Sequence, residues 1–212
     1  DFIPVTPTSI FSNITLQFDR KDLQFSQKDG LAKATVNIYA RISSMARRTV
    51  NVFEDVVTVE VPQQMLQQAA TGSSVYQKTV PLAPGKYRLN VVAKDITGGN
   101  MTTYEVALDV PRFEEDSLAS SSLILADLIE KVPTKSIGAG QFVIGGSKVR
   151  PRLNETFKRD EKMGIYLQLY NFAADEKTQK PNATVEYEVT KNGTNKKIFE
   201  FAEVGMPVVV HA

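Results

Sequence analysis

Hydrophobic and polar residues alternate at every second position over much of the chain. In residues 34–42, Ala, Val and Ile at even positions alternate with Thr, Asn, Tyr and Arg at odd positions. A period of two is the spacing of side chains on one face of a β-strand, so this stretch predicts a half-buried strand. Similar stretches cover residues 14–18, 57–61, 75–82, 87–93 and 104–110. The pattern predicts six or seven strands before Pro111 and an all-β fold.

Turn-forming residues separate these strands at regular intervals. Gly, Pro, Asn, Asp and Ser gather at residues 28–30, 70–73, 83–85 and 98–100. Short strands with regular turns and no βαβ rhythm favour an immunoglobulin-like, Greek-key β-sandwich. Tyr87 follows a Pro-Gly turn at a strand start, which is the position of a tyrosine corner, whose phenol bonds to nearby backbone.

Two local features interrupt the first series of strands. The charged pair Glu54-Asp55 predicts a bulge or turn before the strand at residues 57–61. Pro62 suits the first position of a helix, so a turn or two of helix is expected at residues 63–70.

The alternation breaks at residues 111–116, which contain three consecutive acids. We interpret this segment as a linker and predict two tandem sandwiches, residues 1–112 and residues 113–212. In the second half, residues 122–129 fit either a strand or a short helix, and Gly145-Gly146 predicts a hairpin turn. Residues 165–170 form its clearest predicted strand, and residues 185–189 and 198–201 predict a hairpin around Asn192-Gly193.

The second sandwich has fewer predicted strands than the first. We expect it to be incomplete, either truncated or completed by another segment or chain, because an unpaired sheet edge is an aggregation hazard. The first residue is Asp1 rather than Met. A processed or excised fragment of a longer protein is therefore expected.

The composition argues against most enzyme classes. The 212 residues include no Cys and a single His, His211. Thiol nucleophiles, thiolate metal sites, Ser-His-Asp arrangements and multi-His metal centres all need residues that this inventory lacks. We predict no catalytic residue, no metal site and no cofactor.

Charge and hydropathy limit the partners. With 25 basic and 24 acidic residues, the formal net charge of +1 provides no electrostatic footprint for nucleic acid. The longest apolar run, residues 123–126, ends at Asp127 and is too short to span a bilayer. A protein partner or self-assembly is expected, and a small-molecule ligand is not indicated.

Several motifs resemble functional sites only superficially. Gly138-Ala139-Gly140 lacks the third glycine of a dinucleotide loop and precedes a predicted strand rather than a helix. Residues 114–116 lack the spacing of a calcium loop and suit a solvated linker. Asn-x-Ser/Thr sites occur at Asn13, Asn100, Asn154, Asn182 and Asn192. They indicate a glycan coat in a secreted eukaryotic protein, or else turn and strand-edge chemistry.

One interaction surface is suggested by aromatic and basic residues in the second half. Tyr166 and Tyr170 share one face of a predicted strand, and Tyr187 belongs to a strand that lies across from them if the sheet forms. Arg150 and Arg152 lie in a locally basic stretch with interleaved acids. Exposed, these residues would form a contact surface; buried, the tyrosines would be core.

Several segments together resemble a known family. They are Leu82-Ala83-Pro84-Gly85-Lys86-Tyr87-Arg88-Leu89, Ser121-Ser122-Leu123-Ile124-Leu125-Ala126-Asp127, Gln141-Phe142-Val143-Ile144-Gly145, Lys148-Val149-Arg150-Pro151, Phe157-Lys158-Arg159-Asp160-Glu161-Lys162 and Ile165-Tyr166-Leu167-Gln168-Leu169-Tyr170-Asn171-Phe172. They resemble the C-terminal region of GWxTD-domain proteins of Acidobacteria and related bacteria. The motif that names the family is absent, because the chain has no Trp. The resemblance implies an exported location, periplasmic, extracellular or in the cell envelope, and family chains that continue beyond Ala212; it carries no catalytic residues.

These inferences lead to one expected function and one alternative. We expect a non-enzymatic structural or protein-interaction module of an exported bacterial envelope protein, assembling by strand addition at the open edge of the second sandwich. The alternative is a carbohydrate- or ligand-binding accessory module of a larger enzyme. An exposed row of aromatic side chains on a sheet face would favour the alternative.

Overall fold

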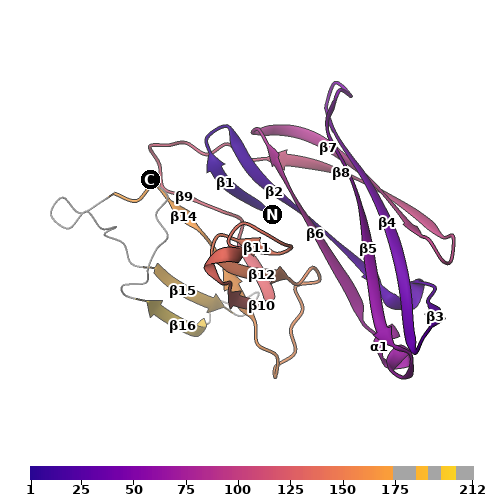
Figure 1. Cartoon of the computed structure of the whole chain (residues 1–212). Helices are drawn as coiled ribbons and strands as arrows, with labels where there is room; N and C mark the ends of the chain where they lie inside the picture. Colours follow the sequence, from indigo (N-terminus) through magenta and orange to yellow (C-terminus); the bar gives the residue numbers. More distant parts are fainter. Residues whose placement is uncertain (174–184, 191–196, 204–212) are drawn as a thin grey trace.

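The chain consists mainly of antiparallel β-strands (Figure 1). The computed structural model describes residues 1–173, 185–190 and 197–203. Helix in these residues is confined to short turns: η1 (Arg20–Asp22), η2 (Gln63–Met65), α1 (Leu66–Ala70) and η3 (Thr134–Ser136). The prediction of an all-β fold is confirmed.

Eight strands make up the first part of the chain. They are β1 (Phe2–Thr6), β2 (Ser9–Asp19), β3 (Ser26–Lys28), β4 (Leu31–Ser44), β5 (Thr49–Pro62), β6 (Ser73–Leu82), β7 (Gly85–Asp95) and β8 (Met101–Val110). One sheet has the order β1-β2-β6, and the other has the order β5-β4-β7-β8, with β3 paired to the start of β4. Side chains from both sheets form one buried core, so this part is a β-sandwich. Its assignment to the immunoglobulin-like class stays a prediction.

The alternation in β4 explains how this core forms. Ala34, Val36, Ile38, Ala40 and Ile42 are all buried, whereas the residues between them are partly or fully exposed. Full burial of each Val or Ile side chain contributes roughly 1.5–3 kcal/mol relative to exposure. The central strand of the larger sheet was therefore predictable from its pattern alone.

Three local predictions for the first part can be compared with the structure. The helical turn after Pro62 is confirmed by η2 and α1. Tyr87 donates a hydrogen bond from Oη to the carbonyl oxygen of Ala83 at 2.9 Å, as expected for a tyrosine corner. The bulge predicted at Glu54-Asp55 is wrong, because β5 pairs with β4 in regular register through both residues.

Eight strands, most of them short, follow the loop at residues 111–118. They are β9 (Ala119–Ser120), β10 (Ile124–Lys131), β11 (Val143–Ile144), β12 (Ser147–Pro151), β13 (Gly164–Tyr166), β14 (Leu169–Tyr170), β15 (Val185–Thr190) and β16 (Lys197–Glu203). The sheets have the orders β11-β12-β10-β13, β14-β9 and β15-β16. The segment that fitted strand or helix is the strand β10, and Gly145-Gly146 joins β11 to β12 as predicted.

The predictions for the last strands are confirmed in part. β15 and β16 pair antiparallel as expected, while the turn at Asn192-Gly193 lies outside the described residues. The single strand predicted at residues 165–170 is wrong, because it divides into β13, which pairs with β10, and β14, which pairs with β9. The alternation of apolar and polar residues continues from β13 into β14, so it does not reveal the break between these strands. Which strand each of them pairs with depends on segments that are distant in sequence.

The first strand connects the two parts of the molecule. Ile3 of β1 lies in a second buried cluster with Ile124, Ala126, Ile144 and Val149. The backbone of Phe2 donates to Ser122 Oγ at 2.8 Å, and the Ser122 N–H donates to the Phe2 carbonyl at 2.9 Å. β1 thus pairs with β2 on one side while its outward side chain packs into the second core. The predicted domain limits at 112/113 stay a prediction.

Candidate interaction groove

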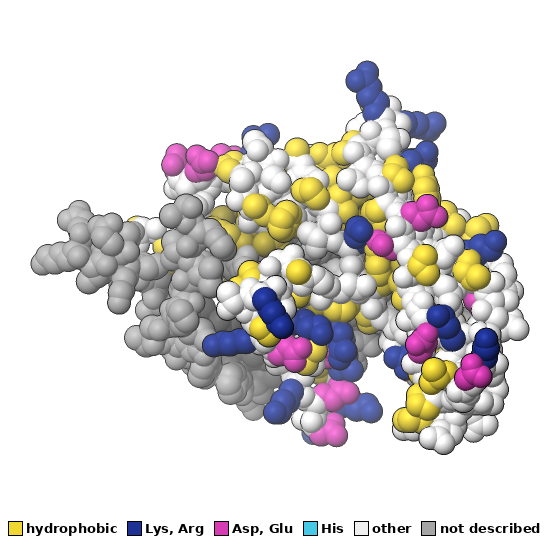
Figure 2. Space-filling view, in the orientation of Figure 1, with side chains coloured by type: hydrophobic (Ala, Val, Ile, Leu, Met, Phe, Trp, Pro, Cys, Tyr) yellow, Lys and Arg dark blue, Asp and Glu magenta, His cyan; other side chains and the backbone are white. Residues whose placement is uncertain are grey.

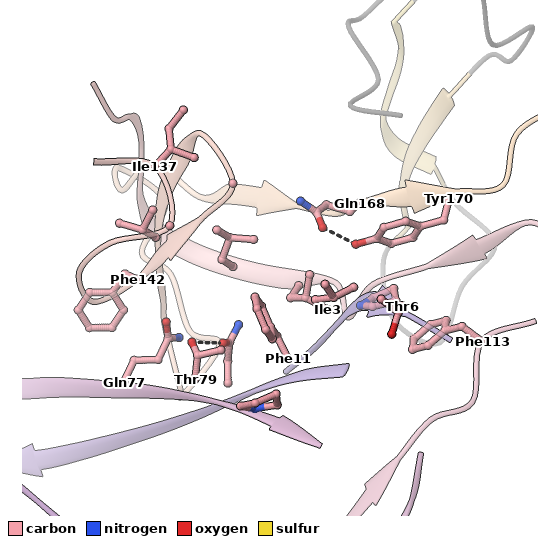
Figure 3. Close-up of a pocket in the computed structure, with 18 of the residues that line it drawn as sticks. Ile3, Thr6, Phe11, Gln77, Thr79, Phe113, Ile137, Phe142, Gln168 and Tyr170 are labelled. Atoms are coloured by element: carbon pink, nitrogen blue, oxygen red, sulfur yellow. Dashed lines mark hydrogen bonds between the residues drawn. The ribbon is translucent and has the colours of Figure 1, made fainter. Parts of the chain in front are cut away.

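A groove separates the outer face of β2 and β6 from the segment 137–145 and from β14 (Figure 3). Its volume is about 1480 Å³, and we call it the central groove. β1 lines it from the side, and Phe113, in the loop after β8, lines one end. The groove is thus formed by segments that are distant in sequence.

A polar stripe forms the floor of the central groove. Antiparallel register places Asn13 of β2 opposite Thr79 of β6, and Thr15 opposite Gln77. Thr79 Oγ1 donates to Asn13 Oδ1 at 2.7 Å, and Gln77 Nε2 donates to Thr15 Oγ1 at 3.1 Å. Phe11 lies on the same face and is 41% exposed. The floor therefore offers amide and hydroxyl groups beside an accessible aromatic ring.

A chain of side-chain hydrogen bonds forms the opposite wall. Tyr170 Oη donates to Gln168 Oε1, and Gln168 Nε2 donates to Tyr166 Oη at 2.7 Å. Burial raises the pKa of both tyrosines above the usual phenol range. Because both phenols stay neutral at physiological pH, this wall presents uncharged hydrogen-bonding groups.

The segment before β11 completes the wall. Gly138 and Gly140 have φ values of +73° and +93°, which lie in the left-handed region that favours glycine. Phe142 has a φ of +67°, a conformation that bulky residues rarely adopt, and its side chain lines the groove. The Gly138-Ala139-Gly140 motif therefore shapes a turn that leads into a strand.

Charged groups lie at the ends of the groove. At one end, Asp55 Oδ2 accepts hydrogen bonds from Lys78 Nζ at 2.8 Å and from Tyr76 Oη at 2.5 Å. These two partners hold the pKa of Asp55 below its usual value, with the larger contribution from Lys78. Glu114 and Glu115 line the other end. The middle of the groove is neutral, and elsewhere acidic and basic side chains are interspersed on the face in Figure 2.

The structure brings together only part of the predicted interaction surface. Tyr166 and Tyr170 are both half-buried and joined through Gln168, and Tyr170 lines the central groove. They are neither the exposed patch nor the fully buried core that the sequence left open. Tyr187 belongs to β15, and its side chain lies outside the described part of the structure.

The two predicted arginines lie apart from the groove. Arg150 Nε contacts Asp127 Oδ1 at 2.6 Å. Arg152 Nη1 contacts Glu161 Oε2 at 2.5 Å, and its guanidinium lies 4.8 Å from the ring centre of Phe157. Both side chains thus already have acidic partners within the chain, which explains why the basic stretch presents little free charge.

Sequence reasoning missed the residues of the groove floor. Phe11, Gln77 and Thr79 occupy the outward positions of two weakly patterned strands, where polar residues are ordinary. Their significance depends on the β2–β6 register and on the second part of the chain covering that face. The signal for the groove floor is the burial of Gln77, a neutral amide at an outward strand position. This burial is visible in the structure and not in the sequence.

The possible glycosylation sites differ in accessibility. Asn13 is only 7% exposed, and its amide Nδ2 is buried, so a glycan does not fit there on the folded chain. Asn100 and Asn154 are exposed at turns, and Asn154 Oδ1 accepts a bond from the Thr156 backbone at 3.2 Å. This bond is the turn chemistry expected of Asn-x-Thr. Asn182 and Asn192 lie outside the described residues.

Comparison with known proteins adds no assignment. No protein-family model matches the chain, and no curated protein matches its sequence.

Within the described residues, no three His, Asp or Glu side chains are grouped as a metal ion requires. No helix among these residues has the length and hydropathy needed to cross a membrane.

Proposed function

We propose that this chain is a non-enzymatic protein-interaction module whose central groove receives an extended segment of a partner polypeptide. The size of the groove carries the proposal. Pockets for small molecules typically have volumes of about 300–1,000 Å³. At about 1480 Å³, the central groove suits a segment of a polymer.

The chemistry of the groove supports a polypeptide occupant. Gln77, Thr79 and Gln168 supply neutral donors and acceptors, which are the groups that pair with peptide N–H and C=O. Phe11 adds an exposed aromatic ring, and aromatic residues are enriched at protein interfaces. β11 contributes only two residues, so side-chain contacts would carry more of the binding than a long β-ladder.

A peptide-display selection against the wild-type chain tests the proposal. We expect enriched peptides to share a sequence pattern and to bind about tenfold or more weakly to the variant Phe11→Ala, because that variant loses an exposed ring in the groove. Tyr39→Ala is the matched control, since it removes an exposed aromatic ring from β4, outside the central groove. A selection without a common pattern, or peptides that bind Phe11→Ala as tightly as wild type, would contradict the proposal.

A neutral carbohydrate is the second candidate ligand. The exposed Phe11 ring beside Thr79 and the Gln77 amide is an arrangement that also suits a sugar ring. In this case the chain would be a binding module attached to an enzyme. Titration with neutral oligosaccharides, followed by NMR of Phe11 and its Ala variant, separates the two candidates.

The exported location expected from the family resemblance remains part of the proposal, and fractionation of the source cells tests it.

A further inference from the structure

The two lateral edges of the first sandwich differ in chemistry. At the edge formed by β5 and β6, the inward positions opposite Ile38 and Ile14 are occupied by Asp55 and Lys78. The two side chains form an ion pair with an N–O distance of 2.8 Å, and Tyr76 donates to the same carboxylate oxygen. Inward-pointing charges are a known device that prevents further strands from adding to a sheet edge. The inward ion pair therefore disfavours the addition of a further strand at the β5–β6 edge, and we call this edge closed.

The opposite lateral edge, between β2 and β8, is lined mainly by apolar side chains. A groove of about 250 Å³ lies there, and we call it the lateral groove. Ile14 and Leu16 line it from β2, and Val106 and Leu108 line it from β8. Asp1 lines it as well, and its α-ammonium donates to the carbonyl of Asn13 at 3.2 Å. Tyr104 occupies an inward position on β8 and is nevertheless 63% exposed. In the described part of the chain, the partly buried apolar side chains of Leu16, Val106 and Leu108 thus remain accessible at this edge.

The backbone of β8 is available along this groove. Among the described residues, β8 pairs with β7 alone. The Asp95 N–H donates to the carbonyl of Asn100, whereas the Ile96 N–H donates to the carbonyl of Thr35 in β4. Continued along the register, this pattern directs the even-numbered residues of β8 to β7. Because backbone groups alternate in direction along a strand, the odd-numbered residues of β8 direct their N–H and C=O groups to the open side.

The sequence of β8 carries few of the usual protections of an edge strand. Residues 101–110 contain no Pro and no Lys, and their pairing with β7 shows no bulge. The acids Glu105 and Asp109 lie on the outer face, where they contact Arg88 and Lys86 of β7. An edge strand without Pro, bulge or inward charge, beside a mainly apolar groove, is an arrangement that accepts an additional strand.

We propose that β8 accepts a β-strand from a partner protein, and that apolar side chains at alternate positions of this strand fill the lateral groove. Glu105 and Asp109 on the outer face of β8 stay 53% and 73% exposed beside their partners Arg88 and Lys86, so Lys, Arg or Thr between the apolar positions of the donor strand would add to these contacts. A second copy of this chain fits less well, because pairing two β8 edges brings their four outer-face carboxylates together. The lateral and central grooves have only Asn13 in common, so this proposal is independent of the function proposed above.

A synthetic peptide of the expected pattern, Lys-Val-Thr-Val-Lys-Val-Thr-Val-Lys, serves as the probe. We expect it to bind the wild-type chain and to slow amide hydrogen exchange at Thr103, Glu105 and Ala107, whose N–H groups face the open edge. A peptide of the same composition with its valines placed consecutively is the control for alternation.

Two variants test the site without disturbing the β7–β8 ladder. Ala107→Pro removes one outward N–H, whereas Ala107→Thr keeps it and serves as the matched control. Tyr104→Lys places an inward charge at the open edge, as Lys78 does at the closed edge. We expect affinity for the probe to fall about tenfold or more in Ala107→Pro and Tyr104→Lys and to remain unchanged in Ala107→Thr.

Several outcomes would overturn the proposal. They are a wild-type chain that does not bind the probe, equal binding to Ala107→Pro and Ala107→Thr, and protection that appears outside β8. Light scattering distinguishes the remaining possibility, since a dimer of the free chain that Ala107→Pro dissociates would identify a second copy as the occupant and contradict a partner strand.

Discussion

At the scale of single residues, a few polar side chains stabilise the strands through hydrogen bonds and ion pairs. Asp55 is the clearest case, because it occupies an inward position and is satisfied by Lys78 and Tyr76. Lys78 and Tyr76 keep the pKa of Asp55 below its normal value of 3.8. The interaction therefore stabilises the fold above that pH, and this contribution is lost as the pH falls through the folded-state pKa.

This relation gives a prediction for the variant Asp55→Asn. We expect wild type to lose more of its unfolding free energy than the variant between about pH 5 and pH 2, because the variant has no carboxylate to protonate. Urea unfolding at several pH values measures the difference. Glu60→Gln is the control, since its partner Lys33 belongs to an exposed pair on the same sheet. Parallel pH profiles for wild type and Asp55→Asn would contradict the prediction.

The tyrosine corner gives a second prediction at this scale. Tyr87→Phe removes the hydrogen bond to Ala83 and keeps the ring, so we expect a loss of about 1 kcal/mol in unfolding free energy. Tyr39→Phe removes an exposed hydroxyl from β4 and should change the stability by much less. Chemical denaturation of both variants decides the matter, and equal losses would argue against a role for the corner.

At the scale of elements, the hairpin between β7 and β8 depends on a buried carboxylate. Asp95 is buried, and its two oxygens accept the backbone N–H groups of Gln24 at 2.7 Å and Thr97 at 3.0 Å. Gly98 packs against the same carboxylate, where a Cβ atom would lie 2.6 Å from Oδ2. One side chain thus fixes both the turn and the loop before β3.

Replacing this carboxylate with an amide tests that role. In Asp95→Asn, one of the two N–H groups faces an amide NH₂ instead of an acceptor, which costs about 1–3 kcal/mol. We expect the melting temperature to fall and amide exchange at Gln24 and Thr97 to accelerate. Asp109→Asn, an exposed acid on the same hairpin, should leave both measurements unchanged.

The same scale shows how far the sequence could predict the fold. β4 and β7 were predictable because each buries one face, so that alternation reports directly on burial. The failure at Glu54-Asp55 arose because an inward charge looks like a break unless its partner Lys78 is known. The failure at residues 165–170 arose because β13 and β14 have different partners. The grooves could not be predicted, since register and the packing between distant segments create them.

At the scale of the whole molecule, β1 couples the two cores. Ile3 is buried in the second cluster, while the backbone of its strand pairs with β2 of the first sandwich. We expect Ile3→Ala to cost about 2–5 kcal/mol, as for other buried isoleucines truncated to alanine. Loss of exchange protection in β10 and β12 would show that the effect reaches the second core. Val5→Ala, an exposed position on the same strand, is the control. A loss confined to the first sandwich would contradict the coupling.

The central claim is that the central groove is where a partner polypeptide binds. Photo-crosslinking tests it directly, with benzoylphenylalanine replacing Val5 at the groove or Val56 on the outer face of β5, positions that are 51% and 62% exposed. In an extract of the source organism, we predict a discrete adduct from position 5 alone. Mass spectrometry should map it to one extended segment of one protein, and Phe11→Ala should abolish it. The same adducts from both positions, or none from position 5, would contradict the account.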